Sequence, residues 1–502
     1  MNTRALFVAS GAETAPTEYA LPFAEPHTTT LLIIGSFLYL LNVIHRIFQF
    51  LFGAGLVGQL VLGAIYCIPL GNILPLDIQT SIGAIGYLGL LLLIVEGGLD
   101  ARLDILSERK NSAICILVAL FGITLPIGFS MVVLHFGYHY DVLESFVVGA
   151  ALSATSLGTT FAIMSSFRFP TPSSDPQPNV PDADPAESSK SSRDQSNLGE
   201  TRAGTILMGA ALLDDIVGLV ISSVVSNLGP TGTESQISGW VIARPIVSSA
   251  AMLIATTLLA KYISPRFIAL LCSAIPQGLS NNKWAYQFPN IALFLFILVV
   301  SAYITIAHYI GSSMLIGAFC AGGLMSHSWK VLQAHVESDA IIYWSPHTSY
   351  ERIAPVQNYV LAPFFFASIG AAIPVRSLFQ ATTAWRGILY SAIMVVAKVL
   401  AGAWLPLWST LEHWLRPHSQ TRSTPSWPAG LFVGFALVTR GEIGLLILNI
   451  AQAEGLVSEE AFGVGIWAVV LSTLLGPIGV GRLLQTRMAG WIVGGPWGVR
   501  ST

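Results

Sequence analysis

Charged residues are scarce in this chain of 502 amino acids. They make up 10% of it, whereas hydrophobic residues make up 53% and the mean hydropathy is +0.67. A soluble protein carries about 25% charged residues, so the composition excludes an ordinary soluble fold and predicts an all-α polytopic protein whose main partner is the lipid bilayer. The chain also lacks basic runs interleaved with aromatic residues, and its formal net charge is −3. We therefore expect no nucleic-acid partner.

Cysteines and targeting signals are scarce as well. The four cysteines, Cys67, Cys115, Cys272 and Cys320, lie in or beside apolar runs without Cys-x-x-Cys spacing. This pattern indicates neither a disulfide framework nor a zinc site, and it predicts buried side chains. Residues 1–28 lack the basic start and short apolar core of a cleavable signal. We expect them to form a polar extracytoplasmic segment, and we expect the first apolar run to remain as a membrane helix.

Long apolar segments dominate what is present. A helix needs roughly 17 to 25 residues to cross a hydrocarbon core about 30 Å thick. About thirteen segments qualify, at 29–49, 50–70, 79–98, 112–135, 143–166, 203–228, 239–262, 288–309, 312–327, 357–373, 385–408, 429–453 and 460–484. They predict a transmembrane domain over residues 29–484 and a short cytoplasmic tail at 485–502. Residues 171–200, rich in Ser, Pro and Asp, predict a disordered cytoplasmic loop within that domain, and residues 264–287 an interfacial helix.

The basic residues predict the orientation of the chain. With the N-terminus outside, 18 of the 24 Lys and Arg residues fall in segments assigned to the cytoplasm. They are Arg46, Arg102, Arg109, Lys110, Arg168, Lys190, Arg193, Arg202, Lys261, Arg266, Lys283, Lys330, Arg352, Arg416, Arg422, Arg482, Arg487 and Arg500. Such a bias agrees with the positive-inside rule. Two further basic residues, Lys398 and Arg440, lie inside apolar segments.

Two pairs of segments resemble each other. IVEGGLDARLDIL (94–106) resembles ASIGAAIPVRSLF (367–379), and GAALSATSLGTT (149–160) resembles VGFALVTRGEIG (433–444). Seven predicted helices separate the members of each pair, so the two copies have opposite orientations in the membrane. Inverted repeats are typical of secondary transporters, whose substrate site lies near the midplane at the repeat interface.

Five charged side chains are expected deep in the membrane, with Glu96 nearer a helix end: Asp214, Asp215, Lys398, Arg440 and Glu442. At the bilayer centre each costs at least about 2.5 to 3.5 kcal/mol on insertion scales, so such residues pair with one another or line an ion path. Two cations against three anions leave one carboxylate unbalanced. A buried unbalanced carboxylate has to hold a proton or a metal cation, because its bare charge is too costly. Alternation between the two is the chemistry of an exchanger.

The two aspartates are about 100° apart on a helix, so both can border one cavity. One can pair with Lys398 while the other remains available to the ion. The alternative is that all five charges form permanent ion pairs between helices. Small and hydroxyl residues at 153–160 and 439–442 predict unwound segments that offer carbonyl groups to a cation. Alternatively, these residues only allow close helix packing.

The stretch ETRAGTILMGAALLDDIVGL (200–219) resembles the aspartate-bearing helix of the monovalent cation/proton antiporter superfamily, the sodium/hydrogen exchanger family, in its electrogenic two-aspartate branch. SATSLGTTFAI and TRGEIGLLI resemble the two unwound helices of that family. VVAKVLAG resembles its helix with a membrane-embedded lysine, and PFFFASIG the helix before the second unwound region. The motifs follow the family's order from about residue 50 to 484.

The resemblance implies roles for individual residues. Asp215 is the carboxylate that binds the transported cation or a proton. Asp214 forms a salt bridge with Lys398 that breaks when the ion enters, so the two aspartates are the ligands of a transported monovalent cation. The residues implied to support the two crossovers are Thr155, Ser156, Arg440 and Glu442. No cofactor is implied.

The resemblance also implies a fold and an activity. The fold has inverted repeats, two crossing unwound helices, and a core domain that moves against a dimerisation domain in a homodimer. The protein is not an enzyme; it exchanges Na⁺, or Li⁺ or K⁺, for protons by alternating access and electrogenically. The sequence does not distinguish the plasma membrane from an endomembrane. The loop at 171–200 is longer than is usual in the family, and no large tail follows residue 484, so regulation by such a tail is not expected.

Other classes fit less well. A potassium-efflux channel-like relative is the main alternative, and the intact pair of aspartates argues against it. An intramembrane aspartyl protease needs aspartates on two facing helices, whereas here they are adjacent on one. A non-transporting membrane receptor has no need for Lys398 and Arg440.

Overall fold

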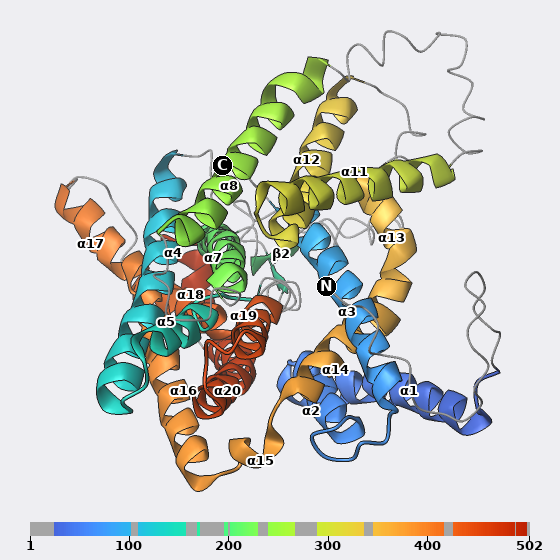
Figure 1. The fold of residues 1–502 in the computed structure, drawn as a ribbon. Helices are drawn as coiled ribbons and strands as arrows, with labels where there is room; N and C mark the ends of the chain where they lie inside the picture. Colours follow the sequence, from blue (N-terminus) through green and yellow to red (C-terminus); the bar gives the residue numbers. More distant parts are fainter. Residues whose placement is uncertain are drawn as a thin grey trace, which may run out of the picture.

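The computed structural model describes residues 25–101, 109–156, 168–170, 195–198, 201–228, 239–266, 289–335, 345–415, 425–486 and 488–498. In this part of the chain helices predominate, and most of the helices pack into two bundles (Figure 1). We name each bundle after its central helix, α3 or α7.

The α3 bundle combines the beginning of the chain with a middle segment. Its helices are α1 (Thr28–Phe52), α2 (Gly55–Tyr66), α3 (Leu76–Asp100), α11 (Pro289–Ile310), α12 (Met314–His335), α13 (Pro346–Val356), the π-helical turn η10 (Gln357–Leu361) and α14 (Ala362–Ala372). Close approaches through glycine hold it together. A methyl group on Gly370 of α14 would lie 2.0 Å from the carbonyl oxygen of Leu60 on α2. Small residues let membrane helices pack backbone to backbone in this way.

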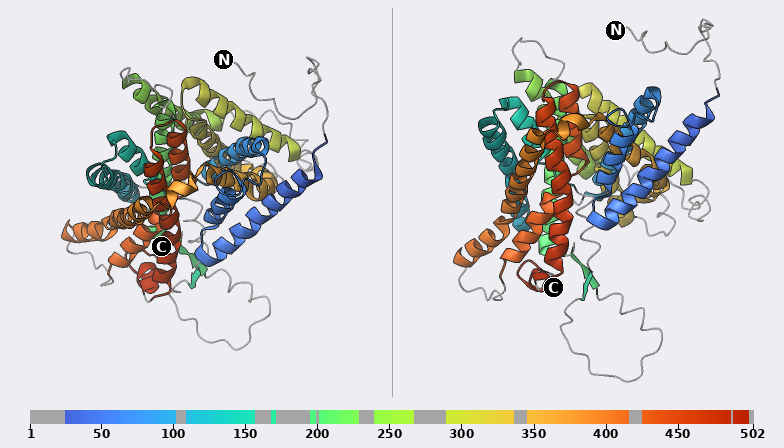
Figure 2. Two further views of the ribbon diagram at one scale, coloured as in Figure 1. Left: turned by 60° about the horizontal axis from the view of Figure 1, so that its bottom comes forward. Right: turned by 90° about the horizontal axis from the view of Figure 1, so that it is seen from below.

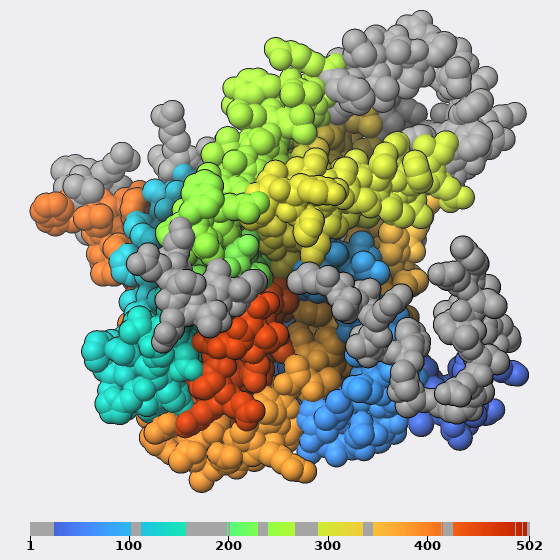
Figure 3. Space-filling model, viewed as in Figure 1, coloured from blue at the N-terminus to red at the C-terminus, as the bar shows by residue number. Residues whose placement is uncertain are grey.

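The α7 bundle contains most of the intramembrane charges. Its helices are α4 (Arg109–Ser130), its π-helical extension η2 (Met131–Gly137), α5 (Val142–Ala151), α7 (Arg202–Leu228), α16 (Ala381–Gly402), α17 (Trp404–Leu415), α18 (Trp427–Val438), α19 (Glu442–Ala453), α20 (Glu459–Leu484) and α21 (Met488–Gly494). Short α15 (Val375–Leu378) joins the bundles, and α8 (Gly239–Leu258) with η7 (Leu259–Ile263) packs on α7 and α12. Figure 3 shows α8 and α11 covering one end of the visible face, with the C-terminal helices beside α5 below them.

The multi-pass all-α prediction is confirmed. Each of the thirteen predicted segments contains helix, but in the described part of the chain nine helices are long and apolar enough to span a membrane. The pair α18 and α19, bent by 40° at a break, raises the number to ten. Helices α2 and α5 are too short to qualify, and α12 ends in the polar stretch SHSWKVLQAH. The count of thirteen spans is therefore not reproduced.

Within the loop predicted at 171–200, the structure describes only residues 195–198, at its C-terminal end. Strand β1 (Arg168–Pro170) pairs antiparallel with β2 (Gln195–Asn197), placing Phe169 opposite Ser196. Residue Leu198 is fully buried against α7. Backbone pairing and this apolar contact order residues 195–198, which the polar composition alone did not indicate. Both strands project from the end of the molecule at which the chain terminates (Figure 2).

Some predictions fall outside the described residues. They concern residues 171–194 of the loop, most of the interfacial helix expected at 264–287, residues 1–24, and Cys272. The other three cysteines are buried and unpaired, as expected.

Candidate functional site

Helix α7 carries the two adjacent aspartates through the interior of its bundle. It runs for 27 residues without proline, and most of its small and aliphatic side chains are buried where it packs on α4, α8, α18 and α19. Asp214 is 1% exposed and Asp215 is 7% exposed. Burial of two neighbouring carboxylates requires compensation from other elements of the bundle.

Two breaks in neighbouring helices supply backbone polar groups near the two aspartates. Helix α5 starts at a capping box formed by Asp141 and Glu144, ends at Ala151, and is followed by non-helical residues up to Ser156. Helix α18 ends at Val438, and α19 starts at Glu442. A helix end leaves up to four backbone groups without partners inside the helix, so each break exposes polar backbone inside the bundle. Residues 157–160 of the first segment lie outside the described part of the chain.

The two breaks are joined to each other. The backbone N–H of Ser156 donates to the carbonyl of Thr439 at 3.1 Å, and Arg440 Nη1 donates to the carbonyl of Ala154 at 3.2 Å. A methyl group on Gly441 would lie 2.8 Å from Ser156 Cβ, closer than unbonded carbon atoms tolerate. The crossing therefore depends on a glycine at position 441.

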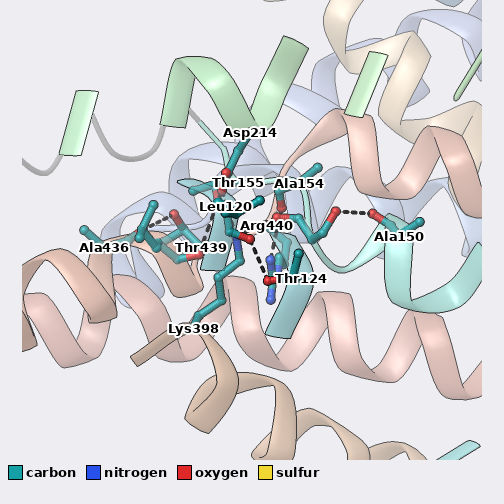
Figure 4. Close-up of polar contacts among 12 residues, drawn as sticks. Leu120, Thr124, Ala150, Ala154, Thr155, Asp214, Lys398, Ala436, Thr439 and Arg440 are labelled. Carbon is teal, nitrogen blue, oxygen red and sulfur yellow. Dashed lines mark hydrogen bonds and ion pairs between the residues drawn. The ribbon is translucent and has the colours of Figure 1, made fainter. Parts of the chain in front are cut away.

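Lys398 of α16 forms an ion pair with one of the aspartates (Figure 4). Its Nζ lies 2.8 Å from Asp214 Oδ2, and it also donates to Thr155 Oγ1 at 3.0 Å and to the carbonyl of Ser153 at 2.5 Å. Thr155 Oγ1 in turn donates to Asp214 Oδ2 at 2.8 Å. The Lys398 side chain is fully buried. Two of its three contacts come from the segment that follows α5.

Several buried polar atoms of the site have no hydrogen-bond partner among the described residues. They are Asp214 Oδ1, Asp215 Oδ1, and Nε and Nη2 of Arg440. Native proteins leave few such atoms unpaired, because each costs its full desolvation. An unpaired carboxylate oxygen can accept a proton or bind a metal cation. The site therefore contains one paired carboxylate, one carboxylate without an ion pair in the described part of the chain, and a lysine that is held in place by the first.

Glu442 lies at the second break, as the first residue of α19, and is half-buried. Carboxylates near a helix N-terminus interact favourably with its dipole. Together with Thr155, Ser156 and Arg440, it completes the set of supporting residues named from the sequence. The structure brings all of them to the two breaks.

Sequence reasoning missed two contributors. Gly122 of α4 lies against the ion pair, and Thr473 of α20 donates to the carbonyl of Arg440 at 3.2 Å. Gly122 belongs to no motif, Thr473 lies in LSTLLGPIG (471–479), which matches only a weaker pattern of the family, and an isolated Gly or Thr in a membrane helix is common. No sequence signal could have singled them out.

Comparisons with known proteins agree with this geometry. The family model described as "Sodium/hydrogen exchanger, transmembrane" matches residues 29–486. The chain is 25% identical over 402 residues to the high-affinity Na(+)/H(+) antiporter NhaS3 of Synechocystis sp., covering 79% of this chain and 70% of that protein. It is 26% identical over 395 residues to the Na(+)/H(+) antiporter of Enterococcus hirae, covering 78% and 82%.

The fold is also found in a solved structure. The sodium proton antiporter MjNhaP1 from Methanocaldococcus jannaschii at pH 8 superimposes with a TM-score of 0.57 at 15% identity, covering 92% of this chain and 100% of that one. Fold and sequence relatives together define an integral, multi-pass membrane transporter of the cation/proton antiporter class. The chain belongs to the sodium/hydrogen exchanger family, and the match covers its transmembrane part.

Proposed function

We propose that this antiporter exchanges Na⁺ for protons electrogenically and that Asp215 is the site for which the two ions compete. The observation that carries the proposal is the asymmetry of the two aspartates: Asp214 is paired with Lys398 at 2.8 Å, whereas Asp215 Oδ1 is buried without a partner in the described residues. A carboxylate in that state has to be neutralised by a proton or a cation. The names of the Synechocystis and Enterococcus relatives favour Na⁺ as the cation.

Lys398 supplies the second proton of the exchange. When a cation binds between Asp214 and Asp215, the positive charge displaces the ammonium group of Lys398 from Asp214 Oδ2. An ammonium group without its partner in a low-dielectric interior loses its proton readily. One cation then replaces protons from both Asp215 and Lys398, which makes the exchange electrogenic.

Transport occurs by alternating access, in which the α7 bundle moves as a unit against the α3 bundle. The site side chains come from the segment that follows α5, from α7, α16 and α19, and from the break between α18 and α19. These elements also contact one another. The site can therefore cross the membrane inside one rigid body, while the α3 bundle anchors a homodimer.

The test uses purified protein in proteoliposomes with an internal pH dye. We expect NaCl, added outside, to change the internal pH in the wild type, LiCl and KCl to give the ion preference, and Asp215→Asn to abolish the response to every cation. A well-folded wild type without any cation-linked proton movement would contradict antiport and favour a channel-like relative or a receptor.

The role of Lys398 has its own test. Lys398→Gln is one methylene shorter and keeps a hydrogen-bond donor, but it carries no titratable proton. We expect exchange by this variant to lose its dependence on an imposed membrane potential. If Lys398→Gln retains voltage-dependent exchange, the lysine is a structural strut and not a proton carrier.

A further inference from the structure

Helix α17 follows α16 and projects sideways from the α7 bundle, at the end where the chain terminates (Figure 1 and Figure 2). Its first half is fixed to that bundle. The ring centroid of Trp404 lies 4.9 Å from that of Phe121 on α4, and Ser409 Oγ lies 2.6 Å from Ser426 Oγ, beside the start of α18. In its second half, every side chain that the structure describes is exposed.

Tryptophan residues mark where the membrane surface crosses this part of the chain. Trp385 lies in the first turns of α16, and Trp404 begins α17. A rise of 1.5 Å per residue separates them by about 28 Å, close to the roughly 30 Å of a hydrocarbon core, and tryptophan is enriched at both surfaces of a bilayer. Trp427 and Trp491, whose rings lie 6.4 Å apart, are partly exposed near the same end as Trp404. Helix α16 therefore crosses the core alone, and α17 begins at the membrane surface.

The exposed apolar stripe of α16 continues along α17. Large apolar side chains recur at intervals of three, four or seven residues, which places them on one face of a helix: Leu389, Val396, Leu400, Leu407, Leu411 and Trp414. Trp414 is 78% exposed, more than any of the others. The exposed Glu412 lies on the other side of α17, about 160° from Trp414. Beyond the span, α17 is thus an amphipathic helix whose apolar face is uncovered in the described part of the chain.

We propose that α17 lies along the membrane surface, on the cytoplasmic side in the orientation that the basic residues predict, and inserts Leu407, Leu411 and Trp414 between the lipid headgroups. Amphipathic helices bury their apolar face about 5 to 10 Å into the boundary between headgroups and acyl chains. Lipid is the occupant because the same stripe faces the bilayer along α16. Since its first half is fixed to α4 and α18, α17 anchors this end of the α7 bundle to the leaflet. The inference does not depend on the ion site, so its test is independent of the exchange reaction.

The test measures the depth of a fluorophore attached to α17. Leu411→Cys is labelled with a thiol-reactive fluorophore and reconstituted into proteoliposomes. The wild type gives the labelling background, which is low for Cys67, Cys115 and Cys320 because these side chains are buried. Three quenchers are compared: iodide in the water on both sides, a phospholipid with a nitroxide near the headgroup, and one with a nitroxide near the end of the acyl chain. We expect the shallow nitroxide to cause the greatest loss of fluorescence at position 411.

Two matched variants calibrate the depth. Glu412→Cys carries the label at the same point along α17 but on the other side, so we expect iodide to be its strongest quencher. Leu389→Cys carries it on the same stripe near the middle of α16, where the deep nitroxide should be strongest. If Leu411→Cys does not reconstitute, Leu407→Cys gives the same comparison one turn earlier.

Three results at position 411 would overturn the inference. Strongest quenching by the deep nitroxide would make α17 a continuation of the span. Strongest quenching by iodide would place the stripe in water. Protection from all three quenchers would show that protein, such as a second copy of this chain, covers the stripe in place of lipid.

Discussion

Adjacent aspartates on one helix face different environments because each turns toward a different neighbour. Asp214 is held by Thr155 and Lys398, which approach from the break after α5 and from α16. Asp215 is almost as buried but has an oxygen without a partner in the described part of the chain. Charges within apolar segments could be found from the sequence because they cost so much there. Gly122, which lies against the ion pair, could not be found from the sequence, because glycine has no side chain that would mark it.

Thr155 is the residue whose hydroxyl group links the lysine to the aspartate. Thr155→Val removes the donor to Asp214 Oδ2 at nearly constant volume. A hydrogen bond to a charged group contributes about 1.5 to 3 kcal/mol, so we expect a lower Tm in detergent and a weaker cation affinity.

Thr155→Ser is the control for this substitution, because it keeps the hydroxyl group. We expect its Tm and its KM for Na⁺ to remain close to wild type. Equal losses in the Val and Ser variants would show that packing of the methyl group matters, and not the hydrogen bond.

At the scale of elements, the crossing of the two breaks is the feature that creates the site. Clusters of Ser, Thr and Gly indicated from the sequence where the helices break. The sequence could not show that Ser156 and Thr439 bond to each other, because that contact joins residues far apart in the chain. The inverted repeat remains a prediction.

Gly441 tests the closeness of that crossing. Gly441→Ala places a methyl 2.8 Å from Ser156 Cβ, and overpacking of this kind costs about 1 to 3 kcal/mol. We expect a lower Tm and a loss of exchange. The control is Gly481→Ala in α20, where a methyl meets nothing within 4 Å among the described residues. If both variants behave like the wild type, the crossing is looser than the structure indicates.

The C-terminal segment caps the aspartate-bearing helix. The backbone N–H groups of Arg202 and Ala203, in the first turn of α7, donate to the carbonyls of Gly498 and Trp497 at 3.1 and 2.9 Å. Trp497 is 1% exposed, and the Arg202 guanidinium lies 4.5 Å from its ring centroid. These contacts satisfy amide groups that have no partner inside a helix. The sequence predicted only a short tail here, since backbone capping over such a distance leaves no sequence pattern.

Trp497→Ala should release this cap. Loss of a buried Trp side chain costs about 3 to 5 kcal/mol of stability. We expect this loss to detach residues 488–498 from α7 and to leave the rest of the bundle folded. We expect faster hydrogen exchange in the first turn of α7, measured by mass spectrometry. Trp491→Ala, in the short helix α21 that precedes Trp497, should change it less, because Trp491 is 41% exposed. Equal protection in both variants would contradict the capping role.

At the scale of the whole molecule, the two bundles differ in the side chains that they contain. The α7 bundle contains the proposed ion site, and the α3 bundle packs through small residues at its helix contacts. Composition was sufficient to predict an all-α membrane protein. The number of spans was not, because α2 and α5 are short apolar helices and α12 ends in a polar stretch. Apolarity alone does not separate a spanning helix from a half-span.

In the proposed exchange, one buried carboxylate, Asp215, binds the cation and the proton in turn. The most direct test measures the apparent KM for Na⁺ in proteoliposomes as a function of pH. Protons occupy the shared site increasingly as the pH falls, so the account predicts that KM rises, approaching about tenfold per pH unit for each competing proton, while the maximal rate at saturating Na⁺ is retained. A KM for Na⁺ that is independent of pH, in a protein that still exchanges Na⁺ for protons, would show that the two ions use separate sites and would contradict the account.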